Sequence, residues 1–370
     1  MRILNLVSSN IVQDPRIQKQ METIKSVTDN YIVLGKLNEN VTDSRLESLN
    51  FNFKLFGKKN KENTIISKLL NRIRFGVNVI QYIKKYQPNI IHANDFDMLF
   101  ITFLSRYKKA KIIYDAHEIY AKNAFINKFT IISFIVQQIE KYIVKRIDGF
   151  ITVSHAASSY YKSKGYAKEA IVITNAPIKE EGIIQNTVKD HFDIVYQGQL
   201  VENRGYEEFL KSGKLIKNSE INLIIRGFGN LKEKLQSDKE ELKIENVRIE
   251  EPVEMDQLVK ALSKSDVGVI LTKPTSINFE YTVSNKIFEC IHAGLPAILS
   301  PVKEHKYLND IYNFGIVLDE VTSENIAEAI FNLYKNPETY NELKNNAIKA
   351  SEVLTWQNES KKLLELYKGK

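Results

Sequence analysis

Short runs of β-branched and other apolar residues alternate with stretches of helical periodicity along the whole chain. We predict strands at residues 2–7, 30–34, 90–92, 111–115, 149–153, 170–173, 193–197, 222–227, 247–249, 267–271, 297–300 and 315–317. Helical patterns fill the intervals, for instance at residues 17–27, 96–107 and 132–147. Because parallel strands need long crossover connections, which are usually helices, this alternation predicts an α/β fold.

A polar segment interrupts the alternation near the middle of the chain. Residues 175–188 include Asn-Ala-Pro-Ile-Lys-Glu-Glu-Gly, whose proline and glycine are typical of a linker. A chain of 370 residues is long for one hydrophobic core and sufficient for two domains. We therefore expect two α/β halves with a cleft at the carboxyl ends of their strands, where open α/β sheets bind ligands.

Composition excludes several classes of protein. The chain is 43% hydrophobic and 26% charged, and no apolar run approaches the roughly 18 residues of a membrane span. The single cysteine, Cys290, excludes an internal disulfide and a cysteine metal cluster, and the aspartates lack metal-loop spacing. Because the N-terminus enters a strand without a signal-peptide pattern, we expect a cytoplasmic protein. We also expect no bound metal and no cofactor.

The chain is basic, with a net charge of +7 and a pI near 9.0. Much of the excess lies in one segment, which contains Lys54, Lys58, Lys59, Lys61, Lys68, Arg72 and Arg74. Its helical part is either a surface helix that meets anionic lipid on the inner face of the plasma membrane or a core-packed helix with a solvated basic face. We favour the second interpretation. No recognition motif accompanies the charge, so we expect no nucleic-acid partner.

The segment from Ser284 to Ser300 reads as one short helix that runs into a buried strand. Ser284 is a candidate N-cap whose oxygen would accept a backbone N–H, and Gly294 ends the helix. Asn285 and Glu289 lie four residues apart and share a face. A helix N-terminus favours an anion, and a carboxylate one turn later suits a sugar diol. The pattern fits a nucleotide lying along the helix, and equally an amphipathic helix with one exposed glutamate.

Two turns of the C-terminal half combine glycine with arginine. One is Gly198-Gln-Leu-Val-Glu-Asn-Arg-Gly205, where glycine lets the backbone approach a ligand and Arg204 is placed to pair with phosphate. On these residues alone, a turn with a solvated arginine is the better explanation. The other is Arg226-Gly-Phe-Gly229, which lacks the third glycine of the dinucleotide fingerprint and is a weak nucleotide signal.

Polar side chains also follow the predicted strands of the N-terminal half. Tyr114-Asp-Ala-His-Glu118 places His117 at a strand end, and Asn94 and Asp95 follow the neighbouring strand. Asp14 is a candidate N-cap, with Pro15 and Arg16 in the first helical turn. We expect these side chains at the cleft, although a structural histidine would give the same pattern.

Taken in order, these pieces resemble the group 1 glycosyltransferases of family four, retaining enzymes with the GT-B fold, in particular those that build bacterial surface polysaccharides. The resemblance rests on Asp14-Pro-Arg16, His92-Ala-Asn-Asp95, Tyr114-Asp-Ala-His-Glu118, Tyr196-Gln-Gly198, Arg204-Gly205, Arg226-Gly-Phe-Gly229 and Ser284-Asn-Lys-Ile-Phe-Glu289. It implies two doubly wound, Rossmann-like α/β domains that face each other across a cleft. Residues 1–180 would take the acceptor and 190–352 the nucleotide sugar, and a C-terminal helix at 353–370 would return to the N-terminal domain.

The resemblance also implies roles for individual residues. Glu289 would hydrogen-bond the nucleotide ribose, Arg204 would contact the donor diphosphate, and His117 would face the donor sugar near its anomeric carbon. Backbone N–H groups at residues 283–286 would reach the same phosphates. The other expected site residues are Gly198, Gln199, Arg226, Gly227, Ser284, Asn285 and Lys286 on the donor side, and Asp14, Arg16, Asn94 and Asp95 on the acceptor side.

Two positions depart from the family pattern. The family commonly has two glutamates eight residues apart, whereas Glu280 precedes Glu289 by nine, and the sugar-contacting catalytic role is transferred to Glu280. The family often has arginine after the glycine of its phosphate loop, whereas this chain has Gln199. Either one positive charge on the leaving group is missing, or Lys286 supplies it.

The sequence therefore predicts transfer of a hexose from a UDP- or GDP-linked sugar to a growing surface glycan or lipid-linked acceptor, with retention at the anomeric carbon. Without a metal, Arg204 and the helix dipole at Ser284 would stabilise the departing phosphate. Two alternatives stay open. One is a sugar-nucleotide epimerase of the same fold, and the other is a non-catalytic nucleotide-sugar-binding subunit, which Gln199 suggests.

Overall fold

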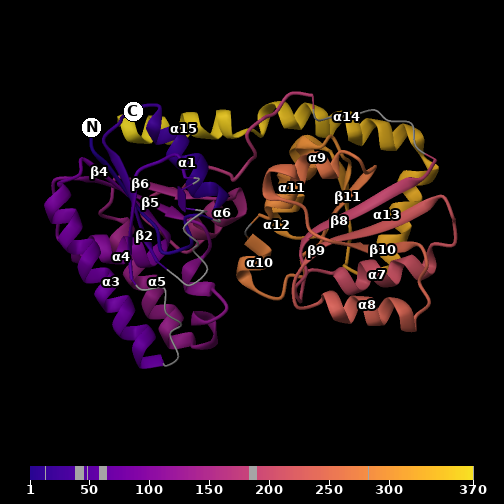
Figure 1. The fold of residues 1–370 in the computed structure, drawn as a ribbon, viewed down its shortest axis with the longest axis horizontal. Coiled ribbons are helices and arrows are strands. Elements are labelled where there is room, and N and C mark those ends of the chain that lie inside the picture. Colours follow the sequence, from indigo (N-terminus) through magenta and orange to yellow (C-terminus); the bar gives the residue numbers. More distant parts are fainter. Residues whose placement is uncertain are drawn as a thin grey trace. The chain divides into compact units, whose positions relative to one another are not determined.

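The computed structural model describes residues 1–12, 14–37, 46–47, 49–57, 65–182, 190–281 and 283–369. They form two units, one made of residues 1–174 with 360–370 and the other of residues 175–359. Each unit is a parallel sheet flanked by helices (Figure 1), which confirms the predicted α/β class. Lys58, Lys59, Lys61 and residues 183–189 of the predicted linker lie outside the described residues.

The first unit contains a seven-stranded sheet with the strand order β3-β2-β1-β4-β5-β6-β7. Its strands are β1 Ile3–Leu6, β2 Tyr31–Lys36, β3 Phe53–Phe56, β4 Ile90–Asn94, β5 Lys111–Ala116, β6 Gly149–Thr152 and β7 Ile171–Val172. Its helices are α1 Pro15–Lys25, α3 Ile65–Tyr86, α4 Asp95–Leu104, η1 Tyr120–Lys122, η2 Ile126–Lys128, α5 Thr130–Val144 and α6 His155–Ser163. The final helix, α15 Trp356–Lys368, enters this unit at residue 360.

The second unit contains a six-stranded sheet with the strand order β10-β9-β8-β11-β12-β13. Its strands are β8 Phe192–Gln199, β9 Ile221–Phe228, β10 Val247–Glu250, β11 Val267–Ile270, β12 Ala297–Leu299 and β13 Gly315–Val317. Its helices are α7 Tyr206–Leu215, α8 Lys232–Glu241, η3 Met255–Gln257, α9 Leu258–Leu262, α10 Ile277–Tyr281, α11 Asn285–His292, α12 Lys303–Tyr312, α13 Ser323–Lys335 and α14 Pro337–Val353.

Both sheets are doubly wound, and the strand order determines where each unit can bind a ligand. In the first unit the order reverses between β1 and β4, and in the second between β8 and β11. All residues of β1, β4 and β11 are buried, as expected for parallel strands that are covered on both faces. In such sheets the crevice at the carboxyl ends of the two reversing strands is the binding site.

Capping residues set the ends of the helices near these crevices. Asp14 caps α1 by accepting hydrogen bonds from the backbone nitrogens of Arg16, at 3.1 Å, and Ile17, at 3.4 Å. Gly294 follows α11 with φ +67°, a left-handed conformation that glycine adopts without strain. Both signals were predicted from the sequence and are confirmed.

The strand β3 was missed by the sequence analysis. It has four residues, Phe-Lys-Leu-Phe, and pairs with β2 at the edge of the sheet. Lys54 interrupts its apolar run, but the side chain lies over the rings of Phe56 and Tyr82, with its Nζ 5.4 and 5.1 Å from their centroids. A charged side chain that covers aromatic rings thus concealed a short edge strand.

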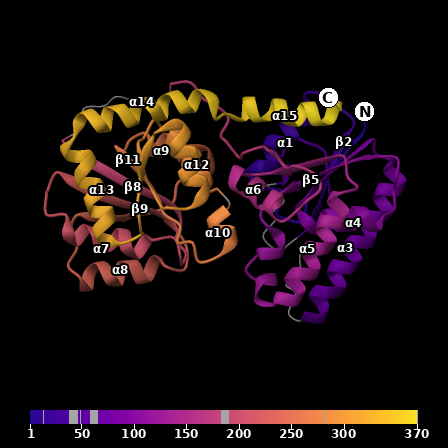
Figure 2. The same cartoon turned by 180° about the vertical axis from the view of Figure 1, so that it is seen from behind.

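The C-terminal helix packs on the first unit, as expected. The hydroxyl of Tyr367 lies 2.7 Å from Nδ1 of the buried His92, and Lys362 donates to the carbonyl of Val172 at 3.1 Å. Both views show α15 beside α1 (Figures 1 and 2). The end of the chain is therefore anchored to the middle of β4 and to the last residue of β7.

Candidate functional site

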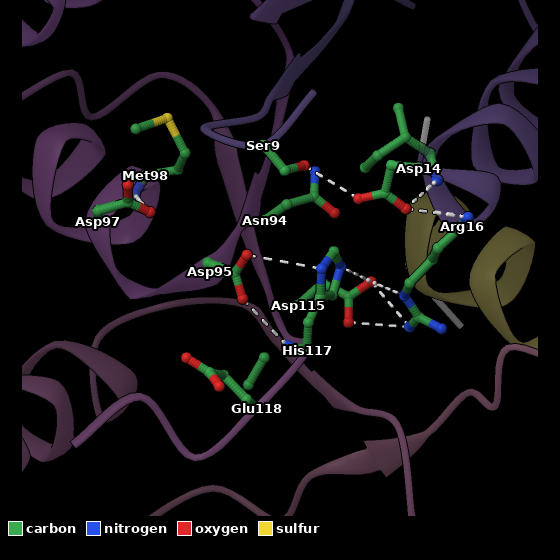
Figure 3. Close-up of polar contacts among 12 residues, drawn as sticks. Ser9, Asp14, Arg16, Asn94, Asp95, Asp97, Met98, Asp115, His117 and Glu118 are labelled. Carbon is green, nitrogen blue, oxygen red and sulfur yellow. Dashed lines mark hydrogen bonds and ion pairs between the residues drawn. The ribbon is translucent and has the colours of Figure 1, made fainter. Parts of the chain in front are cut away.

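A buried ion pair lies at the carboxyl end of the first sheet (Figure 3). Arg16 in α1 donates from Nε to Oδ2 and from Nη2 to Oδ1 of Asp115 in β5, both at 2.9 Å, and its Nη1 donates to the carbonyl of Ile173 at 2.8 Å. Both residues are almost completely buried. Although burial alone would raise it, the guanidinium holds the pKa of Asp115 well below its usual range.

Amide side chains extend this ion pair across the sheet. Gln20 donates to Asp115 at 2.7 Å and accepts from Asn5 at 3.1 Å, while Asn94 donates to Asn5 at 2.6 Å and to the carbonyl of Leu6 at 3.0 Å. All three amide side chains are buried. Buried polar groups of this kind need such partners, so the network fixes α1, β1, β4 and β5 relative to one another.

His117 lies between two carboxylates beside this network. Its Nδ1 is 3.5 Å from Oδ2 of Asp95, and its Nε2 is 3.7 Å from Oδ2 of Asp115. Burial favours the neutral imidazole, but the two carboxylates outweigh it and raise the pKa of His117 to about 9. The side chain is 19% exposed, so the unit presents a cationic imidazole at the end of its sheet.

The structure brings together the four residues predicted for the acceptor side, but it uses them differently. Arg16 and Asn94 are buried and hydrogen-bonded within the unit, so they position their neighbours. Asp14 caps α1 and accepts a hydrogen bond from the Ser9 hydroxyl at 3.0 Å. Asp95 is partly exposed beside His117. Contact of any of them with an acceptor stays a prediction.

Three residues of this cluster were not among the predicted site residues. Asp115 is the centre of the network, and His92 lies with Nε2 3.5 Å from its Oδ2. Tyr367 reaches His92 from α15, about 275 residues later in the chain. An aspartate inside an apolar strand was a usable signal, because a buried carboxylate needs a cation. No sequence pattern around Tyr367 predicted that its side chain would reach His92.

In the second unit, two glycines allow the ends of β8 and β9 to approach each other closely. Gly198 and Gly227 are paired in register and have φ values of +137° and +158°. A Cβ on Gly227 would lie 1.8 Å from the carbonyl oxygen of Gly198, and one on Gly198 would lie 2.1 Å from Cε of Lys286. Both positions therefore require glycine.

Lys286 reaches this glycine turn from the first turn of α11. Its ammonium lies 3.2 Å from the hydroxyl of Tyr206, and 5.2 and 5.5 Å from the ring centroids of Tyr196 and Tyr206. Burial, together with the nearby Arg204, lowers the pKa of Lys286 to about 8. A second cation thus stands at the turn where the predicted phosphate loop carries Gln199, whose side chain is exposed.

Arg204 lines a small pocket in the same unit. Its Nη1 donates to the hydroxyl of Thr272 at 3.0 Å, and its guanidinium carbon lies 4.6 Å from the ring centroid of Phe279. The other lining residues are Val283, Ser284, Val302 and His305. Burial lowers the pKa of His305 to about 4, so this histidine is neutral and Arg204 supplies the positive charge of the pocket.

Ser284 occupies the N-cap position of α11, as predicted, but the predicted capping hydrogen bond is wrong. Its side chain accepts no backbone N–H of the helix and instead lines the pocket. The sequence identified the position because serine favours N-caps, but it did not predict which way the hydroxyl points.

The remaining predicted donor-side residues are distributed around α11 and β9. Arg226 is bonded to Glu250, with 2.9 Å between Nη2 and Oε2, and to Gln197 at 3.2 Å, so its guanidinium joins strands of the sheet. Asn285 is exposed and Glu289 is half-buried one turn later. Glu280 lies 3.4 Å from Nζ of Lys303. Ligand contacts of these residues stay predictions.

The Arg16–Asp115 pair supports a prediction about stability. Replacing Arg16 with Leu leaves a buried carboxylate without its cation, so we expect the free energy of unfolding to fall by about 3–5 kcal/mol. Urea denaturation measures this. The matched control is Arg248→Leu, because that side chain is 51% exposed and its loss should change stability by less than about 0.5 kcal/mol. Equal effects of both variants would contradict the role of the pair.

His117 supports a prediction about pH. Its folded pKa of about 9 exceeds its ordinary value of 6.5, so the bound proton stabilises the fold fully below about pH 6.5 and is lost as pH rises through about 9. The wild type should exceed His117→Gln in stability by up to about 3 kcal/mol near pH 6, and this difference should shrink near pH 9.5. Urea denaturation at both values checks it, and a constant difference would contradict the raised pKa.

Two family models match the chain. The family described as glycosyl transferases group 1 matches residues 178–350, and Glycosyltransferase Family 4 matches residues 56–178. No curated protein matches the chain.

Solved structures share the fold at low sequence identity. HepE from Anabaena in complex with UDP has a TM-score of 0.77 and 16% identity over 100% of both chains. Sucrose-phosphate synthase from Thermosynechococcus elongatus has a TM-score of 0.78 and 14% identity over 100% of this chain and 99% of the other. The lipopolysaccharide outer core galactosyltransferase WaaB has a TM-score of 0.69 and 12% identity over 100% of this chain and 99% of the other. The two family matches are contiguous over residues 56–350, and the chain belongs to the group 1 glycosyltransferases with the GT-B fold.

Proposed function

We propose that this glycosyltransferase moves a hexose from a nucleotide sugar to a glycan or lipid-linked acceptor, with retention at the anomeric carbon and without a metal. The observation that carries the proposal is the pair of cations, Arg204 and Lys286, beside the glycine turn and the N-terminus of α11. The HepE structures contain UDP, UDP with glucose, or UDP-glucose, and they share the fold of this chain.

The cations suit the charge that develops during sugar transfer. As the bond between sugar and phosphate breaks, negative charge grows on the departing diphosphate, and fixed positive charges aimed at it lower the barrier. Arg204 offers a planar guanidinium held by Thr272, and Lys286 offers an ammonium beside Gly198. The N-terminus of α11 adds the positive end of a helix dipole. This arrangement supports a leaving-group role for the second unit.

The place of Lys286 also explains the departure at Gln199. A Cβ on Gly198 would lie 2.6 Å from Nζ of Lys286, so the lysine brings its charge to the backbone of the same turn. The charge that the family often takes from an arginine in this loop would then come from α11. This supports a catalytic protein over the non-catalytic subunit that Gln199 suggested.

The first unit would act on the sugar. His117 is partly exposed and cationic, so it is suited to donate a hydrogen bond to a sugar hydroxyl near the anomeric carbon. The acceptor hydroxyl would attack on the face that the diphosphate leaves, with a phosphate oxygen taking its proton. This mechanism needs no protein nucleophile. Glu280 is proposed to contact the sugar, with its carboxylate oriented by Lys303.

Donor binding is the first test of the proposal. A thermal-shift screen against UDP, GDP, ADP, CMP and their sugar conjugates should show one base that raises the melting temperature, because a ligand that binds the folded state stabilises it. Glu289→Gln should remove that shift, because the ribose loses its carboxylate. Glu338→Gln, at an exposed position of α14, is the matched control and should keep it. Unchanged binding by Glu289→Gln would contradict the ribose contact.

The same preparation then tests the reaction. With the identified donor and an added glycan, NMR of the product should show the anomeric configuration of the donor. Inversion would overturn the retaining mechanism. Conversion of the nucleotide sugar without any acceptor would favour the epimerase, and donor binding with no turnover on any glycan would favour the non-catalytic subunit.

Lys286 gives a prediction with its own pH dependence. Replacing it with Met should weaken donor binding by about tenfold to a hundredfold, since a hydrogen bond to a charged group contributes about 1.5–3 kcal/mol. Wild-type affinity should fall as pH rises through about 8, where the free lysine loses its proton, whereas Lys286→Met should lack this fall. Titration calorimetry measures both, with the exposed Lys306→Met as control. If the donor affinity of the wild type and of Lys286→Met fell equally with rising pH, the pH dependence would belong to another group.

A further inference from the structure

The surface of the first unit exposes a dense group of large apolar side chains. Within eleven residues, the exposed ones are Phe125 (73%), Phe129 (50%), Ile131 (76%), Ile132 (47%), Phe134 (61%) and Ile135 (50%). We call these six residues the α5 patch. The rings of Phe125 and Phe129 are 6.0 Å apart, and the four residues on α5 are spaced so that they neighbour one another on successive turns. Groups of this kind mark interaction surfaces.

The exposure of the α5 patch does not come from a loosely held helix. On the opposite face, Ser133 is buried, donates to the carbonyl of Ala121 at 2.6 Å and accepts from Lys122 at 3.0 Å. Further along, the carboxylate of the buried Glu140 accepts from the Tyr114 hydroxyl at 2.6 Å. In the first turns of α5 a polar side chain thus faces the interior while isoleucine and phenylalanine face outward, the reverse of an ordinary surface helix. Near the end of the helix, Ile143 and Val144 are buried.

The neighbouring helices extend this apolar surface. In both views α3, α4 and α5 lie side by side (Figures 1 and 2), and Phe103 of α4 meets Tyr142 of α5 with ring centroids 5.9 Å apart. Further exposed apolar residues of these helices are Leu69, Leu70, Ile73, Val77 and Leu104. Together with Phe103, Tyr142 and the α5 patch, they make thirteen of the 22 large apolar side chains that are exposed among the described residues.

Between residues 65 and 147, every exposed charged side chain that the structure describes is positive, and the next residue, Asp148, is an exposed carboxylate. Among the described side chains of residues 65–147, those charges are Arg72, Arg74, Lys84, Lys85, Arg106, Lys108, Lys109, Lys128, Lys145 and Arg146. No aspartate or glutamate in that described range is exposed. An exposed apolar surface on helices that also carry exposed cations, with few exposed acidic groups, matches the acyl region and headgroups of an anionic bilayer.

We propose that the α5 patch inserts into the boundary between headgroups and acyl chains of an anionic lipid bilayer, with exposed lysines and arginines of the same unit, such as Lys128, on the headgroups. The attachment is peripheral: within the described residues, no helix is long and apolar enough to span a membrane. The patch begins eight residues after His117, so insertion would hold the polar cluster of the first unit close to the lipid surface. The proposal does not depend on which sugar is transferred.

Co-sedimentation with vesicles tests it. The wild-type protein should sediment with vesicles of phosphatidylglycerol and phosphatidylethanolamine, and little with phosphatidylcholine alone. Ile131→Ser with Phe134→Ser should weaken this binding by about tenfold or more, because two apolar side chains are withdrawn from the lipid. The matched control is Phe228→Ser with Ile311→Ser in the second unit, where the side chains are 59% and 55% exposed, and it should bind as the wild type does.

Charge reversal and oligomeric state complete the test. Lys128→Glu with Arg146→Glu should also weaken binding to the anionic vesicles, and salt should weaken the binding of the wild type. No sedimentation of the wild type with anionic vesicles, or equal binding by the Ile131/Phe134 variant, would overturn the proposal. Light scattering gives a further outcome that would overturn it: the wild type is a dimer, the Ile131/Phe134 variant is a monomer, and neither binds vesicles. In that case the patch would join two copies of the chain. Unchanged thermal unfolding of the variants shows that they are folded.

Discussion

The buried pair of Arg16 and Asp115 is the interaction on which the first unit depends. Its geometry joins the start of α1 to the middle of the sheet and, through the carbonyl of Ile173, to the segment after β7. A buried carboxylate needs both charge compensation and hydrogen bonds, and this one has both. Asp115 also lies near His92 and His117, and after Asp95 it is the second carboxylate that raises the pKa of the His117 imidazole at the end of the sheet.

In the second unit, the ammonium of Lys286 lies beside a tightly packed backbone turn. The two glycines at the ends of β8 and β9 leave room for the lysine side chain from α11. Partial burial lowers the pKa of Lys286 to about 8 and strengthens its interaction with an anion. In the proposed function, this cation from α11 supplies the charge that the family often takes from an arginine at the position of Gln199.

The sequence predicted the parallel α/β architecture and twelve of the thirteen strands found among the described residues, because buried parallel strands are short apolar runs that alternate with helices. The edge strand β3 escaped because an edge is only partly buried. Local capping at Asp14 and Gly294 was also predictable, since it depends on residues close in the sequence. The predicted capping hydrogen bond of Ser284 was wrong. Neighbouring residues in the sequence identified the N-cap position, but they did not determine the direction of the serine hydroxyl.

The sequence by itself determined the fold class, the helix ends and the motifs at the ends of the strands, because these follow from periodicity and from interactions a few residues apart. Tertiary structure decided which motif residues are exposed. It buried Arg16 against Asp115 and placed Tyr367 on His92, partners 99 and 275 residues apart. It also turned the apolar face of α5 outward, because Ser133 and Glu140 found their partners inside. Such choices depend on distant contacts, which no local pattern encodes.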